Sequence, residues 1–241
     1  FPLTDAGDGT YVLAETNISP SNLDALTNGE WYLNVHTTAN PNGEVRGQIV
    51  PDTTAVVTFS LSGSQSVPAV DTMAMGSGYA LFDTTNNSVS LVAVTTLENA
   101  TMAHIHSGFA GENGDVVVTL VESETTAGVW MTDGSVALDE ATAAQLLAGG
   151  HYVNIHSEAF ASGEIRGQIT PDNIEVYGII ASGLQEVPAV TTTASGAGAF
   201  TLNTSTGALS GSVTVTGMTA TMAHIHEGEA GVNGGVLLGL T

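Results

Sequence analysis

The chain contains no cysteine and no lysine, and its only basic residues are Arg46 and Arg166. Without cysteine, disulfide bonds cannot stabilise the fold and thiolate metal sites are excluded. Nucleic acids and anionic membranes are bound through basic patches, so a net charge of −22 argues against both as partners. The sequence also lacks an apolar run long enough to span a bilayer, and we expect no membrane span.

Aromatic residues are scarce at 5%, whereas the chain has 29 glycines and many Thr, Ser, Val and Ala residues. This composition favours short strands and turns over long helices. The acidity is typical of a solvated surface, and it also makes calcium binding possible. Together with the missing lysine and cysteine, it indicates an extracellular or cell-surface protein. The chain begins at Phe1 without a signal-peptide pattern, so we expect a mature or excised piece.

An internal repeat organises the sequence. The hexapeptide Thr101–His106 recurs letter for letter at Thr221–His226, which is 120 residues later. Three further motifs recur at the same offset: 32–36 with 152–156, 43–49 with 163–169, and 67–70 with 187–190. A fixed offset over separate motifs predicts copies of one domain of about 120 residues.

The copies are arranged unusually along the chain. Residues 52–171 hold a complete unit, residues 1–51 hold only the C-terminal half of one, and residues 172–241 hold only an N-terminal half. The halves could complete each other within one chain, as in a circular permutation. They could also pair head to tail between chains, or the chain could be a segment of a longer tandem array. The last two alternatives predict self-association into a linear polymer, and we favour them.

The residue pattern predicts an all-β, antiparallel sandwich or barrel with one short helix per unit. Ser19 is expected to cap the first helix, which should end at Gly29, and its counterpart should run from Asp139 to Gly149. The Asn113–Gly114 pair predicts a tight turn after the strand that carries the histidines. The expected strands cover residues 56–61, 78–82, 88–94, 176–180 and 209–215.

Three histidines of the complete unit form a candidate metal site. His104 and His106 alternate along one strand and therefore share a face, and His156 lies on a second predicted strand. Three neutral imidazoles with an open fourth position favour copper, with zinc as the alternative. A simpler hypothesis is that these histidines hold loops through hydrogen bonds.

The second copy carries His224 and His226 but no third histidine downstream. His36 supplies the third ligand if residues 1–51 complete that unit, so this metal site would straddle the join. Arg166 is expected to pair with Glu164 or another carboxylate, or to guide an anion to the metal.

The motifs resemble those of the CHRD domain, named after chordin. The resemblance rests on Leu61–Val70, Ala103–Gly108 with Asn113–Gly114, and Tyr152–His156 with Gly163–Ile169. It implies an extracellular all-β domain. The His-x-His strand and the later strand that ends in a histidine also resemble copper–zinc superoxide dismutase, which implies a Greek-key fold and copper ligands at His104, His106 and His156. A bridging histidine, zinc-loop ligands and a disulfide are missing.

These observations favour a secreted structural protein that forms a filament or tandem array, with a copper site in each unit. We therefore expect it not to be an enzyme. The alternatives are a copper-dependent, dismutase-like enzyme and an extracellular adhesin or metal-binding module.

Overall fold

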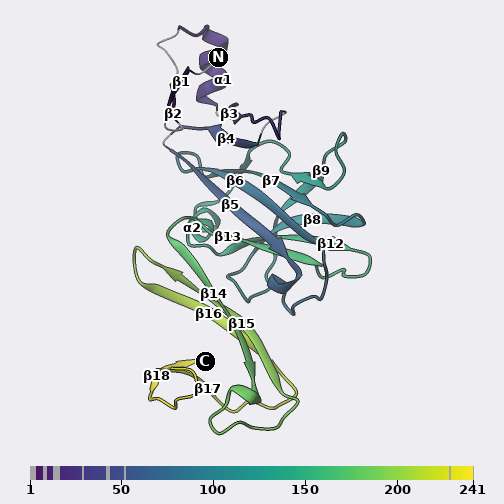
Figure 1. The fold of residues 1–241 in the computed structure, drawn as a ribbon, viewed down its shortest axis with the longest axis vertical. Coiled ribbons are helices and arrows are strands. Elements are labelled where there is room, and N and C mark those ends of the chain that lie inside the picture. The colour runs from purple at the N-terminus through teal and green to yellow at the C-terminus, as the bar shows by residue number, and fades with distance from the viewer. Residues whose placement is uncertain are drawn as a thin grey trace. The chain divides into compact units, whose positions relative to one another are not determined.

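The computed structural model describes residues 4–7, 10–12, 17–28, 30–41, 44–51, 53–227 and 229–240 (Figure 1). The described residues are nearly all in strands and turns, with two short α-helices, which confirms the predicted all-β class. The chain divides into two compact units, Phe1–Thr54 and Ala55–Thr241. The first unit contains β1 (Thr4–Gly7), β2 (Thr10–Val12), α1 (Pro20–Thr27), β3 (Trp31–Val35) and β4 (Val45–Ile49).

The second unit begins with a barrel and continues into a three-stranded sheet and a hairpin. The barrel comprises β5 (Thr54–Ser62), β6 (Met75–Asp83), β7 (Ser88–Thr95), β8 (Ala100–Ser107), β9 (Val116–Glu122), β10 (Val129–Met131), β11 (Val136–Ala137), α2 (Glu140–Leu147), β12 (His151–Ser157) and β13 (Ile165–Ile169). The remaining strands are β14 (Ile174–Ser182), β15 (Ser195–Asn203), β16 (Ala208–Thr216), β17 (Ala223–His226) and β18 (Val236–Leu240). Single 3₁₀ turns at Gly63–Gln65 and Gly183–Gln185 follow β5 and β14.

The barrel is closed by antiparallel pairing. Its strand order is β10-β9-β8-β12-β13-β5-β6-β7, and β10 pairs back onto β7 through Trp130 and Ala93. Strands β8, β9 and β10 follow one another, and β12 returns to lie beside β8, which is a Greek-key arrangement. Closure leaves the eight barrel strands without a free edge.

The inner faces of the strands form an apolar core. On β12, Val153 and Ile155 are fully buried, and they pack in one cluster with Ile105 of β8 and Ile165 of β13. The outer face of β12 is also buried, along its whole length. Successive residues of a strand point to opposite faces, so a second layer must cover the barrel here. That layer consists of the loops after β5, β8 and β12, and it covers the candidate site.

The predicted cap at Ser19 is confirmed, and the structure shows that Asp139 caps the second helix. The Ser19 side chain accepts from the backbone N–H of Asn22 at the start of α1, and the Asp139 carboxylate accepts from Thr142 at the start of α2. Helix α2 buries Ala143 and Leu146 in the barrel core. The expected end of the first helix at Gly29 lies outside the described residues. Each described helix has eight residues, and neither is long and apolar enough to cross a membrane.

The predicted tight turn at Asn113–Gly114 is wrong. Strand β8 ends at Ser107 and β9 begins at Val116, so eight residues connect them rather than two. Contacts outside the hairpin hold this end of the loop: the Asn113 amide donates to the Val67 carbonyl, and the backbone N–H of Gly114 donates to the Tyr152 hydroxyl. These contacts outweigh the local preference for a two-residue turn.

The strands of the two half units repeat the local pairing of the complete unit. Trp31 pairs with Ile49 between β3 and β4, as His151 pairs with Ile169 between β12 and β13. The hairpin β17–β18 has a register shift at Ile225/His226, and β8–β9 has the same shift at Ile105/His106. Each half therefore has the strand geometry of its counterpart, while the boundaries proposed for the units stay a prediction.

Candidate metal centre

The fold brings His104, His106 and His156 together on the outer face of the barrel. Strands β8 and β12 are direct neighbours, with Asn154 opposite His104 and Tyr152 opposite His106. Each of the three histidines offers a ring nitrogen, and these nitrogens all lie within 4.8 Å of one another. Among the residues that the structure describes, this is the only group of three or more His, Asp or Glu side chains with such spacing.

Backbone carbonyls orient two of the three rings. The Nδ1 atom of His106 lies 3.0 Å from the Gly114 carbonyl oxygen, and Nδ1 of His156 lies 3.0 Å from that of Ala161. A carbonyl only accepts, so each Nδ1 carries the proton and each Nε2 keeps a free lone pair. The Nε2 atom of His106 is buried without a hydrogen-bond partner. Metal-bound histidines in proteins are held in this way, with the second ring nitrogen donating to a carbonyl.

The third histidine approaches the free lone pair of His156. The Nδ1 atom of His104 lies 3.1 Å from Nε2 of His156. Two nitrogens bound to one ion at about 2.0–2.1 Å are separated by about 2.9–3.4 Å, depending on the coordination angle. The observed spacing therefore suits either a hydrogen bond or two ligands of one metal ion.

Burial keeps these imidazoles neutral. His106 and His156 are buried and His104 is half-buried. Desolvation lowers the pKa of all three histidines below 6.5, and proximity to His156 and His106 lowers the pKa of His104 further. Neutral imidazole is the form that binds transition metals, so the cluster is in its ligand form at neutral pH.

An aromatic and cationic stack supports His106 from the side. The His106 ring stacks on Tyr152 at 5.1 Å between centroids, and the guanidinium carbon of Arg166 lies 3.5 Å from the centre of the Tyr152 ring. The Tyr152 hydroxyl accepts from the backbone N–H of Gly114. Gly114 thus connects the tyrosine to the carbonyl that orients His106.

The expected pairing of Arg166 with Glu164 is wrong. Arg166 donates to the carbonyls of Phe109 and Glu112 and to the Gln168 side chain. The Glu164 carboxylate instead accepts from Thr72 and Ser157. Loss of solvent lowers the pKa of Arg166 to about 10, which still leaves it charged at neutral pH. Its main role is to fasten the loop after β8 to the barrel.

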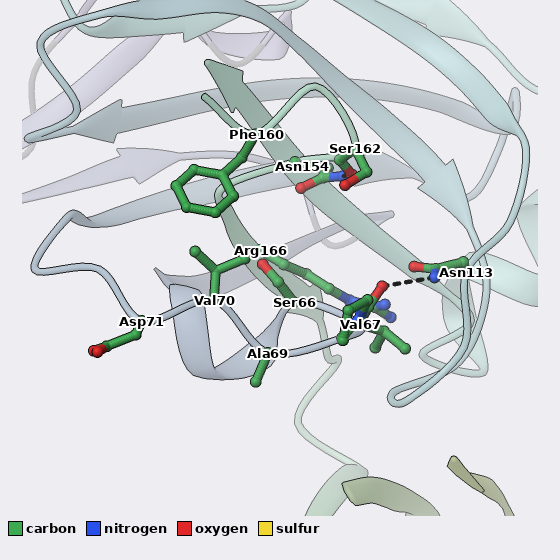
Figure 2. A pocket seen from close by; sticks show the side chains of 12 residues that line it. Ser66, Val67, Ala69, Val70, Asp71, Asn113, Asn154, Phe160, Ser162 and Arg166 are labelled. Atoms are coloured by element: carbon green, nitrogen blue, oxygen red, sulfur yellow. Dashed lines mark hydrogen bonds between the residues drawn. The ribbon is translucent and has the colours of Figure 1, made fainter. Parts of the chain in front are cut away.

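A pocket of about 340 Å³ is lined by Arg166, the cation of the stack with Tyr152, and by Asn154 (Figure 2). Asn154 pairs with His104 on one side and with Arg166 on the other, so the pocket and the histidines share the outer face of the barrel. The side-chain amide of Asn154 donates to the Ser162 carbonyl. Gly163 has a φ of +113°, and a Cβ there would lie 2.1 Å from the Asn154 amide, so only glycine fits this approach.

The remaining predicted ligands are exposed in the structure. His36 belongs to the first unit, and His224 and His226 lie in the second. Among the described residues, none of the three is grouped with two further ligands. The rings of His224 and His226 lie 5.9 Å apart, close to the 5.5 Å between His104 and His106.

Sequence reasoning missed the roles of Tyr152 and the carbonyls of Ala161 and Gly114. The sequence does hold a signal for the tyrosine, because Tyr152 and Arg166 both have counterparts, Tyr32 and Arg46, at the 120-residue offset. The sequence holds no signal for the two carbonyls.

His151, which has Trp31 as its counterpart, is buried and its ring nitrogens have no hydrogen-bond partner.

Comparison with known proteins identifies one relationship. The model of the CHRD domain matches residues 1–49, 57–169 and 177–241, which together make up most of the chain. No curated protein and no solved structure matches the chain. The resemblance to copper–zinc superoxide dismutase therefore gains no support from these comparisons.

Proposed function

The chain belongs to the CHRD domain family, and on this basis we propose that it is a secreted structural protein whose units join end to end into a linear array. CHRD domains occur in secreted proteins, which supports an extracellular location. The strongly acidic, cysteine-free composition fits the same environment. Each unit of the array holds a metal ion, for which copper is the favoured candidate and zinc the alternative.

The observation that carries the array is the exposure of core positions in the half units. Val153 and Ile165 are both 0% exposed in the barrel, whereas their counterparts Leu33 and Val45 are 43% and 62% exposed. Leu238 is 47% exposed, and its counterpart Val118 is 6% exposed. Burying such side chains contributes about 1.5–3 kcal/mol each, so the two halves gain stability if they meet.

The occupant that fits these faces is the complementary half of a second copy. In the complete unit β12 pairs with β8, and the same register at the repeat offset would place Leu33 of β3 opposite Ile225 of β17. The halves already have the right internal pairing, so neither needs to refold. Two joined chains still have one unpaired half unit at each end. Each of these can join a further chain, so the array grows without closing.

The proposed metal site of the complete unit rests on the buried, unpartnered Nε2 atom of His106. An unsatisfied buried acceptor costs about 1–3 kcal/mol, and a bound ion removes that cost. The donor set is three imidazole nitrogens with an open fourth position. It suits Cu²⁺ and Zn²⁺ better than calcium, which prefers oxygen ligands.

Cysteine cross-linking tests the array directly, because the chain has no cysteine of its own. Leu33→Cys and Ile225→Cys are introduced into separate chains, which are mixed and oxidised. Directly opposed residues in a sheet have Cβ atoms about 4.5–5.5 Å apart, within reach of a disulfide after small shifts. We expect a covalent dimer of one chain of each kind.

Leu23→Cys, on the exposed face of α1, replaces Leu33→Cys in the matched control. Equal cross-linking of both mixtures would contradict the proposed join. A double variant that cross-links only within its own chain, at all protein concentrations, would instead favour the circular permutation.

Elemental analysis and electron paramagnetic resonance on untreated protein test the metal. Absence of copper, zinc and nickel, with a stability that a chelator leaves unchanged, would reject the metal site.

The open fourth position also permits a dismutase-like enzyme as a second candidate. Superoxide turnover by the copper-loaded protein that His156→Ala abolishes would support the enzyme over the structural protein. Tight copper uptake by a protein that stays monomeric would favour a metal-binding module.

A further inference from the structure

The ligands of the second metal site are divided between the two half units. His224 and His226 lie on β17, and His36 directly follows β3. We propose that the join between copies is a metal-dependent interface, in which a transition-metal ion bound by all three histidines controls assembly. This inference rests on the proposed array and adds a regulator to it.

Each half already holds its ligands as the complete unit does. The Nδ1 atom of His36 lies 3.0 Å from the Pro41 carbonyl, as that of His156 lies 3.0 Å from Ala161. On the other side, Nδ1 of His226 lies 3.1 Å from the Gly234 carbonyl, which matches the 3.0 Å between His106 and Gly114. Both contacts place the proton on Nδ1, so both Nε2 atoms are available for one ion.

The supporting residues are also in place. The guanidinium carbon of Arg46 lies 3.5 Å from the centre of the Tyr32 ring, the same distance as for Arg166 and Tyr152. Asn233 donates to the Val187 carbonyl as Asn113 donates to Val67. The same offset would place Tyr32 beside His226, where Tyr152 stacks on His106. Joining the halves would therefore assemble the ligands and their supports together.

The division of ligands makes metal binding and assembly mutually dependent. The half unit in residues 172–241 offers two exposed imidazoles and the half unit in residues 1–51 offers one, so neither alone holds an ion as well as the join does. An ion that binds only the joined form raises the association constant by a factor of about 1 + [M]/Kd. At a free-metal concentration 100 times the Kd of the joined site, we expect assembly to strengthen about 100-fold.

The complete unit provides an internal control. Its three ligands, His104, His106 and His156, all belong to one barrel, so its metal affinity does not depend on assembly. His36→Ala removes a ligand only from the join, and His156→Ala removes one only from the barrel. The two variants lose the same chemical group from equivalent positions.

The test is sedimentation velocity with metal analysis on the full chain and both variants, in Zn²⁺ or Cu²⁺ and after removal of metal with a chelator. Thermal unfolding first checks that each variant keeps the barrel, and His156→Gln replaces His156→Ala if that variant fails. We expect two ions per chain in the assembled wild type and one in the dissociated form. His36→Ala should retain one ion and lose the metal response, while His156→Ala should still assemble with metal.

The outcomes separate this inference from the proposal beneath it. If arrays form equally well with and without metal, and His36→Ala behaves like the wild type, metal control is wrong and the array stands. If no condition gives species larger than the monomer, the array itself is wrong. If the assembled wild type holds only one ion per chain, the joined site is wrong.

Discussion

The Nδ1 atom of His104 lies 3.1 Å from the Nε2 atom of His156, and the other ring nitrogen of His156 faces the Ala161 carbonyl. Because the carbonyl must accept, Nε2 of His156 must accept as well, and the shared proton belongs to His104. This contact is therefore a hydrogen bond. In the proposed metal site, Nδ1 of His104 would bind the ion and its proton would lie on Nε2 instead. The three histidines would then be neutral ligands, and the loops that hold the rings of His106 and His156 would not need to move.

The supporting tyrosine should tune this site. We expect Tyr152→Phe to lower the metal affinity of the complete unit about 10-fold, since partners behind a metal ligand contribute about 10–100-fold. The change keeps the ring that stacks on His106 and deletes the hydroxyl that accepts from Gly114. Calorimetric titration with Zn²⁺ measures the effect. In dissociated protein, the matched change Tyr32→Phe should leave this affinity unaltered, and an equal loss from both would contradict the assigned role.

Arg166 should be far more important for stability than Arg46, although their sequence surroundings match. Arg166→Lys removes a planar group that donates to two loop carbonyls and covers Tyr152, so we expect a loss of about 2–4 kcal/mol in the free energy of unfolding. Arg46→Lys, at an exposed position, should change it by less than about 0.5 kcal/mol. Urea unfolding of dissociated protein compares them. Similar losses would mean that the barrel does not depend on this buried cation.

His151 should make the barrel sensitive to acid. Burial lowers its pKa from 6.5 to about 4, and the nearby Gln145 backbone only partly opposes this. The unfolded chain therefore binds the proton more readily, so the contribution of His151 to stability is complete above about pH 6.5 and is lost as the pH falls towards 4. Each tenfold difference in proton affinity is worth about 1.4 kcal/mol, and solvent screening reduces the full value, so we expect a loss of about 2 kcal/mol.

His151→Phe is the variant that isolates this effect, because phenylalanine fills similar space without titrating. Its stability should decline less than that of the wild type between pH 6.5 and pH 4. Chemical unfolding at several pH values gives both curves. Parallel curves would assign the acid sensitivity to other groups.

The sequence was sufficient to predict that His104 and His106 share a face, because alternation along a strand fixes which side chains point the same way, and the structure places His156 beside them. His104 and His106 separate cleanly from Ala103 and Ile105, which are buried in the core. The partners of Arg166 were beyond reach, since they are carbonyls of Phe109 and Glu112 and every residue has a carbonyl. The choice between a sandwich and a barrel stayed open in the sequence. Closure depends on the three residues Val129–Met131, too few for a periodic pattern.

A buried charge separates folding from assembly most sharply. Val153→Asp places a carboxylate in the barrel core, where it has no partner, so we expect the barrel to unfold or to lose more than about 4 kcal/mol. Leu33→Asp makes the equivalent change on an exposed strand, and we expect the barrel to keep its melting temperature. In an array, however, position 33 would be buried as Val153 is, so the same carboxylate should prevent joining. Calorimetry measures the first effect and sedimentation the second. A Leu33→Asp chain that assembles like the wild type would show that this face is not the join.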